Sequence, residues 1–185
     1  MEQIQSTNPG VKSNTGVIYG VITGVAAIAY TIILYVGGLE WFTSPLSYVA
    51  FCIPIVIAVL GGLKQKKLQG GYITFKEALK TLFIIFVIFI VMDALFNHLL
   101  LNVIDVPFRE ALMQDAGVRM EKFMAKMGAN QETIDKAVSE LSNPENFTFK
   151  KIFVGILFRC VGWFIVALII AAIIKKKKPE FENQI

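Results

Sequence analysis

The stretch IIFVIFIVMDALFNHLLLNVI, residues 84–104, consists mostly of Ile, Phe, Val and Leu. Asp93, Asn97 and His98, the only histidine of the chain, interrupt it. A helix of about 20 apolar residues spans the roughly 30 Å hydrocarbon core of a bilayer. The stretch therefore predicts a transmembrane helix that carries an ionisable acid, and this acid is either part of a site or part of the scaffold.

The composition of the whole chain is that of an integral membrane protein. Of its 185 residues, 55% are hydrophobic, and long apolar runs alternate with short charged segments. The net charge of +4 comes partly from lysine clusters at the ends of apolar runs, which indicates membrane topology rather than nucleic-acid binding. We expect a single all-α membrane domain over residues 1–185, with the lipid bilayer as partner and no nucleic acid.

Four segments are long and apolar enough to span the membrane, namely residues 16–38, 45–63, 75–102 and 152–174. The start of the third span is well marked. Thr74 and Glu77 have the spacing of a capping box, and the preceding pair Gly70 and Gly71 suits a turn.

The long connection between the third and fourth spans, residues 103–151, predicts a helical hairpin outside the membrane. Apolar residues recur at helical spacing up to Gly128, and Asn130 can cap a second helix whose apolar face includes Ile134. We expect the hairpin to lie on the bilayer or on the mouth of the bundle. It either covers the helix ends or presents its Met-rich face to an apolar ligand or a partner helix.

Basic residues near the spans predict the orientation. Five lysines surround the second connection: Lys64, Lys66, Lys67, Lys76 and Lys80. Lys175 to Lys178 follow the fourth span, whereas the first connection, residues 39–44, contains neither Lys nor Arg. The third connection opposes this bias with seven Lys or Arg, but it is long and also carries eight acids. Both termini are therefore predicted to be cytoplasmic.

A glycine stripe marks the first span. Gly16, Gly20 and Gly24 recur every four residues, so they share one face of the helix. Small residues matter for packing in lipid because close backbone approach replaces the hydrophobic driving force. The stripe packs against another helix of the same chain or against a second copy of the chain. Trp41, just after this span, is predicted to lie at the outer membrane interface.

Depth supplies a partner for the acid of the third span. Asp93 lies about 13 Å below the outer end of its helix, and Arg159 lies about 10 Å into the fourth span. We therefore expect an ion pair, with Asn97 one turn from Asp93 on the same face. His98 points roughly 140° away from Asp93, which predicts an interfacial position. The three polar residues either clamp two helices together or line a cavity for a small ligand, ion or proton.

The segment GGYITFKEALKT, residues 70–81, resembles domain-of-unknown-function family 4199 of the Bacteroidetes, as does the layout of four spans with a helical loop. The resemblance covers nearly the whole chain. It implies a small four-helix protein of the bacterial inner membrane. It transfers no activity, ligand or catalytic residue to this chain.

Motifs of known chemistry do not appear in the sequence. There is no HExxH, GxSxG or Walker loop, and Cys52 and Cys160 have no metal-ligand spacing. We therefore predict no catalytic residue, no cofactor and no metal. The expected function is that of a non-enzymatic scaffold or accessory membrane protein, with a second copy or another membrane protein as partner. The alternative is a small transporter or channel-like protein that uses Asp93 and Arg159.

Overall fold

The computed structural model describes residues 14–141, 143, 146 and 148–177. Four of its helical segments are long and apolar enough to cross a membrane: Thr15–Val36, Pro45–Leu68, Phe75–Ile104 and Lys150–Ile174. Two further helices lie between the third and fourth of these. The predicted all-α class with four spans is thus confirmed. The ends of the chain, including the predicted cytoplasmic Lys178, lie outside the described residues.

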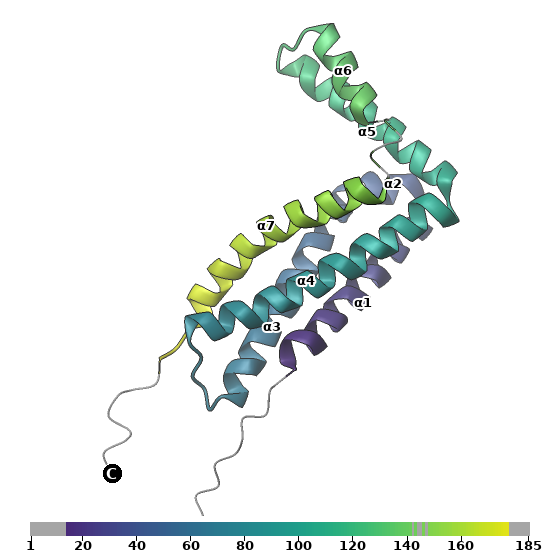
Figure 1. The fold of residues 1–185 in the computed structure, drawn as a ribbon. Coiled ribbons are helices and arrows are strands. Elements are labelled where there is room, and N and C mark those ends of the chain that lie inside the picture. The colour runs from purple at the N-terminus through teal and green to yellow at the C-terminus, as the bar shows by residue number, and fades with distance from the viewer. Residues whose placement is uncertain (1–13, 142, 144–145, 147, 178–185) are drawn as a thin grey trace, which may run out of the picture.

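The helices follow one another in a simple order (Figure 1). They are α1 (Thr15–Val36), α2 (Gly38–Thr43), the 3₁₀ turn η1 (Pro45–Tyr48), α3 (Val49–Leu68), α4 (Phe75–Leu99), the π-helical turn η2 (Leu100–Ile104), α5 (Val106–Lys126), α6 (Gln131–Leu141) and α7 (Phe149–Ile174). The second span was predicted to end at residue 63, but α3 continues to Leu68. A helix does not need apolar side chains once it leaves the hydrocarbon core, and long lysine side chains extend toward water from its last turns.

The start of α4 has the predicted capping box. The Glu77 N–H donates to the Thr74 hydroxyl oxygen at 3.3 Å, and the Thr74 N–H donates to the Glu77 carboxylate at 3.0 Å. Gly70 and Gly71 precede it with φ angles of +76° and +89°. Residues with a Cβ rarely adopt such backbone angles, so the turn between α3 and α4 requires glycine at both positions.

Helix α4 is the centre of the bundle, because it packs against α1, α3 and α7. Its side chains Leu82, Ile85, Phe86 and Ile90 are fully buried. Large apolar side chains on the outer faces of the other spans are exposed, as expected of surfaces that contact lipid.

The glycine stripe of α1 lies against α4 in a parallel arrangement. A Cβ on Gly16 would lie 3.1 Å from Ile84, and a Cβ on Gly20 would lie 2.9 Å from Ile88. At Gly24 the Met92 side chain occupies the space that a Cβ would need. Of the two partners left open by the sequence, a helix of the same chain therefore covers this stripe.

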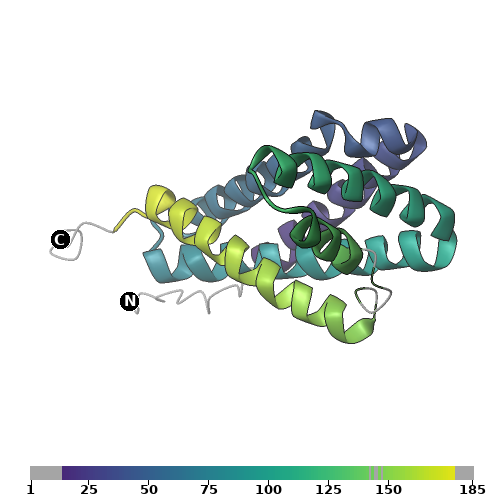
Figure 2. The same ribbon diagram turned by 90° about the horizontal axis from the view of Figure 1, so that it is seen from above.

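The start of α1 and the end of α7 lie at the same end of the bundle. At this end, hydrogen bonds join α7 to α3 and to the turn before α4. The Lys66 ammonium donates to the Ile174 carbonyl at 2.9 Å, which joins α3 to the end of α7. An isolated antiparallel bridge joins Ile73 to Lys176, with hydrogen bonds of 3.0 and 2.9 Å. From this end α7 crosses α4 at an angle, and its N-terminal half diverges from it (Figures 1 and 2).

The predicted hairpin is present as α5 and α6, with Gly128 in the turn at φ +77°. Asn130 caps α6 as predicted, because its side-chain oxygen accepts from the Thr133 N–H at 2.9 Å. Outside itself, the hairpin makes its main contacts with α2 and η2. Figure 1 shows that only its base rests on the bundle and that the remainder projects away, rather than lying across the mouth.

Replacing Gly20 by Val tests the α1–α4 contact. The new side chain must displace Ile88, and overpacking of this kind lowers the free energy of unfolding by about 1–3 kcal/mol. Gly162→Val is a matched control, because a Cβ there would meet no atom within 4 Å. Unfolding of both variants by denaturant in detergent micelles measures the difference. Equal stability of the two variants would contradict the described packing.

Candidate functional site

Asp93 of α4 and Arg159 of α7 form an ion pair within the membrane-spanning part of the bundle. Arg159 Nη2 donates to Asp93 Oδ2 at 2.6 Å. Asn97 adds two hydrogen bonds, because its Nδ2 donates to Asp93 Oδ1 at 3.0 Å and to the Asp93 carbonyl at 2.8 Å. The structure thus brings together the three polar residues that depth and helical phase had placed near one another.

The two charged side chains have different surroundings. The Asp93 side chain is 14% exposed, whereas that of Arg159 is 42% exposed. Arg159 also lies over the ring of Phe89, with its Cζ 5.9 Å from the ring centroid. One turn further along α7, Trp163 packs against Phe86 and Phe89, at centroid distances of 4.8 and 5.5 Å. The acid is therefore held inside the bundle above an aromatic layer, and the arginine reaches it from the surface.

A small cavity of about 90 Å³ touches both members of the pair. Its wall includes Thr31 of α1 and Ala50 of α3. Pro54 lies one turn after Ala50 and has no N–H, so the Ala50 carbonyl cannot accept the usual helical hydrogen bond from residue 54. The cavity therefore lies beside a carboxylate and a guanidinium, and its wall includes the residue whose carbonyl lacks a helical donor.

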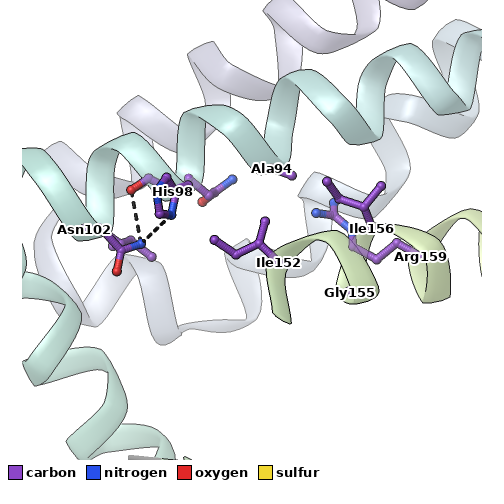
Figure 3. A pocket seen from close by; sticks show the side chains of 9 residues that line it. Ala94, His98, Asn102, Ile152, Gly155, Ile156 and Arg159 are labelled. Atoms are coloured by element: carbon purple, nitrogen blue, oxygen red, sulfur yellow. Dashed lines mark hydrogen bonds between the residues drawn. The ribbon is translucent and has the colours of Figure 1, made fainter. Parts of the chain in front are cut away.

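Arg159 also lines a second, larger space between α4 and α7, an open groove of about 210 Å³. Figure 3 shows Ala94, His98 and Asn102 on the α4 side of this groove. The α7 side is formed by Ile152, Gly155, Ile156 and Arg159. The ion pair thus stands between an inner cavity and an outer groove.

His98 contacts the polar groups near the C-terminal end of α4 rather than Asp93. Its Nδ1 lies 3.1 Å from the side-chain nitrogen of Asn102. The Asn102 side-chain oxygen in turn accepts from Arg109 Nη1 of α5 at 2.9 Å. This chain of contacts leads away from the ion pair toward the base of the hairpin. Sequence reasoning did not foresee the part that Asn102 and Arg109 play in it.

Asp105 anchors the hairpin to the bundle. Its carboxylate accepts from the Tyr35 hydroxyl at 2.7 Å and from the Phe108 N–H at 2.9 Å, which caps α5. The hydrogen bond from Tyr35, followed by that from Phe108, lowers the pKa of Asp105 below its usual value of 3.8. Phe108 packs edge-on against Tyr35 and Phe42, at centroid distances of 5.0 and 5.4 Å. Sequence reasoning did not foresee this anchor.

Trp41 lies in α2, next to this anchor, and is 47% exposed. Its ring covers Gly37, where any Cβ would overlap it. Its interfacial position stays a prediction, which its place on the short helix between two spans is consistent with.

The opposite end of the bundle holds another polar cavity, of about 310 Å³. It is lined by the side chains of α3, α4 and the start of α1, among them Gln65, Gln69, Glu77 and Lys80. The buried Oε1 atoms of Gln65 and Gln69 accept no hydrogen bond from the described residues. Sequence reasoning did not single out these two amides.

The described residues contain no group of three or more His, Cys, Asp or Glu side chains that could hold a metal ion. Cys52 is exposed and Cys160 is half-buried, and both are free thiols. The polar groups of the site are therefore one ion pair and its neighbouring amides.

These observations define a helical membrane protein with four candidate spans and a helical hairpin between the third and the fourth. The chain belongs to the family of proteins of unknown function DUF4199, whose profile matches residues 18–176. The membership expected from residues 70–81 and the layout of the spans is confirmed. No curated protein and no solved structure matches the chain.

A double-mutant cycle on the ion pair measures its structural role. Asp93→Asn and Arg159→Gln each leave one charge without its partner in a membrane-spanning helix, which lowers the free energy of unfolding by about 2–4 kcal/mol. The double variant is expected to recover most of this loss because no charge remains unpaired. Unfolding by denaturant in detergent micelles gives the coupling energy. Additive losses in the double variant would argue against a clamp.

Proposed function

We propose that the protein is a non-enzymatic scaffold or accessory protein of the bacterial inner membrane. In this proposal both termini are cytoplasmic, and the α5–α6 hairpin lies on the outer side, where it contacts another protein. The observation that carries the proposal is the hairpin itself, which is anchored at its base and projects from the bundle (Figure 1).

The hairpin has an exposed apolar face suited to such a contact. Phe123 of α5 and Met127, the residue that caps its C-terminal end, lie one turn apart, and they are 60% and 72% exposed. An aromatic ring beside a flexible thioether is a favourable centre for a protein interface. The fixed base reduces the freedom that the hairpin loses on binding, because α5 is already oriented by Asp105 and Phe108.

The lysine distribution supports the proposed orientation. Lys64, Lys66 and Lys67 end α3, and Lys175 and Lys176 follow α7 at the same end of the bundle. Clusters of this kind are retained on the cytoplasmic side of a membrane. The hairpin is at the opposite end, so the proposed orientation puts it on the outer side of the membrane.

Labelling of single cysteines tests this orientation. In a chain with Cys52→Ser and Cys160→Ser, a membrane-impermeant maleimide should label Ala125→Cys on α5 in intact cells. Leu68→Cys, at the end of α3, should be labelled only after the cells are lysed. Both positions are exposed, so access alone decides the result. The reverse pattern would overturn the orientation.

Photo-crosslinking from the hairpin tests the scaffold function. A photoreactive amino acid in place of Phe123 should give one discrete adduct with another membrane or exported protein in intact cells. Glu121 is the matched control, because it is exposed on the opposite face of α5. Mass spectrometry identifies the adduct. The same adduct should not form when the photoreactive amino acid replaces Glu121. Equal and diffuse crosslinking from both positions would contradict the proposal.

A small transporter or channel-like protein is the second candidate. It is favoured by one observation, namely that the cavity of about 90 Å³ touches Asp93, Arg159 and the Ala50 region next to Pro54. An intramembrane charge beside a cavity is a frequent feature of ion and proton pathways.

Proteoliposomes separate the two candidates. Flux of protons or small ions that is lost in folded Asp93→Asn protein, and retained in the Gly162→Val control, would replace the scaffold by the transporter. The scaffold proposal expects no flux above that of empty liposomes in either protein.

A further inference from the structure

The groove between α4 and α7 lies toward the hairpin end of the bundle, where small residues lie between the two helices (Figure 3). The two helices diverge there, and the residues that face each other across the gap include Ala94 and Gly155. Neither has a side chain long enough to fill the space. A Cβ on Gly155 would meet no atom within 4 Å. The result is an open space of about 210 Å³ on the lipid-facing side of the bundle.

Arg159, at one end of this groove, needs acceptors that hydrocarbon cannot supply. A guanidinium carries five N–H donors. Among the described residues its hydrogen-bond partner is Asp93, and its side chain is 42% exposed. Arg159 lies ten residues after the first residue of α7, about 15 Å along the helix. Because Arg159 lines the groove, oxygen atoms of a ligand there would supply its guanidinium with further acceptors.

The two walls of the groove differ in polarity. The α4 wall presents Asn97, His98 and Asn102, which offer hydrogen-bonding groups. The α7 wall presents Ile152, Gly155 and Ile156, which are apolar. A phospholipid has the same division, because its phosphate and ester oxygens accept hydrogen bonds and its acyl chains do not. The groove therefore fits an amphiphilic ligand better than a purely apolar chain.

Positive charge surrounds the open end of the groove. Arg109 is fixed at its rim by the hydrogen bond to Asn102, and Lys150 and Lys151 are exposed in the first turn of α7. The N-terminus of α7 adds its partial positive charge.

Three acids lie in the same region, and each has a described contact. Asp93 pairs with Arg159, Asp105 accepts from Tyr35, and Glu110 lies 4.0 Å from Arg109. Lys150 and Lys151 are exposed and directly precede Ile152 of the groove wall, so positive charge lies at the groove entrance, which favours an anionic ligand.

We propose that the groove binds one anionic phospholipid. The phosphate lies at the rim near Arg109 and the lysines of α7, and the ester oxygens accept hydrogen bonds from Arg159. One acyl chain follows the surface at Gly155 and Ile156. The lipid supplies hydrogen-bond acceptors to the partly exposed Arg159 guanidinium. This proposal does not depend on the scaffold function or on the orientation in the membrane.

A matched pair of glycine variants tests the site. Gly155→Leu fills the groove, whereas Gly162→Leu adds the same side chain to α7 at a position outside it, where a Cβ also meets no atom within 4 Å. Native mass spectrometry of the detergent-solubilised protein, titrated with phosphatidylglycerol, measures binding. We expect one tightly bound lipid in the original chain and in Gly162→Leu, and about tenfold weaker binding in Gly155→Leu.

Charge is tested in a second arm. Lys150→Gln with Lys151→Gln should reduce the preference for phosphatidylglycerol over phosphatidylcholine. Lys122→Gln with Lys126→Gln removes two exposed lysines from the hairpin and should leave that preference unchanged. Thermal unfolding of every variant confirms that the fold is retained.

Three results would overturn the proposal. One is equal binding of phosphatidylglycerol by Gly155→Leu and Gly162→Leu. Another is equal affinity of the original chain for the anionic and the zwitterionic lipid. The third is a change from dimer to monomer in Gly155→Leu alone, which would identify a second copy of the chain as the occupant of the groove.

Discussion

The glycine face of α1 lies directly against α4, and the other helices are arranged around this pair. In a bilayer the removal of apolar surface from water no longer favours helix association, so close packing must supply most of the attraction. Gly16 and Gly20 allow the α1 backbone to approach Ile84 and Ile88 of α4. With α1 in place, α3 packs against another part of α4, and α7 contacts it through aromatic side chains. Helix α4 therefore carries the core, and every polar group of the site is positioned by it or faces it.

The ion pair contributes specificity where apolar packing is least specific. Large aliphatic side chains pack against lipid almost as well as against protein, so they fix the rotation of a helix only weakly. A carboxylate inside the bundle has few acceptable partners, and Arg159 of α7 is the one that reaches Asp93. The aromatic contacts of Trp163 set how closely α7 approaches α4, and the ion pair sets which face of α7 is turned inward.

Much of this architecture was predictable from the sequence because the membrane imposes strict rules. Length and hydropathy located the four spans, and the Thr74–Glu77 spacing located the start of α4. The similar depths of Asp93 and Arg159 in their helices predicted the ion pair that they form. The partner of the glycine stripe was not predictable, because the same pattern serves contacts within a chain and between chains. The Tyr35–Asp105 hydrogen bond was not predictable either, because it joins a span to a loop whose path no local rule determines.

The backbone bridge between Ile73 and Lys176 has a mechanical consequence. Together with the Lys66 contact to Ile174, it fastens the last turn of α7 to the turn that precedes α4 and to the end of α3. At the other end α7 is held to α4 mainly by the Arg159 side chain, and Gly155 leaves a gap between them. Bending of α7 therefore meets its greatest resistance at the lysine-rich end. We therefore expect the N-terminal half of α7 to move more readily than the half that ends at the lysines, with the hairpin following it through the connection from α6 to α7.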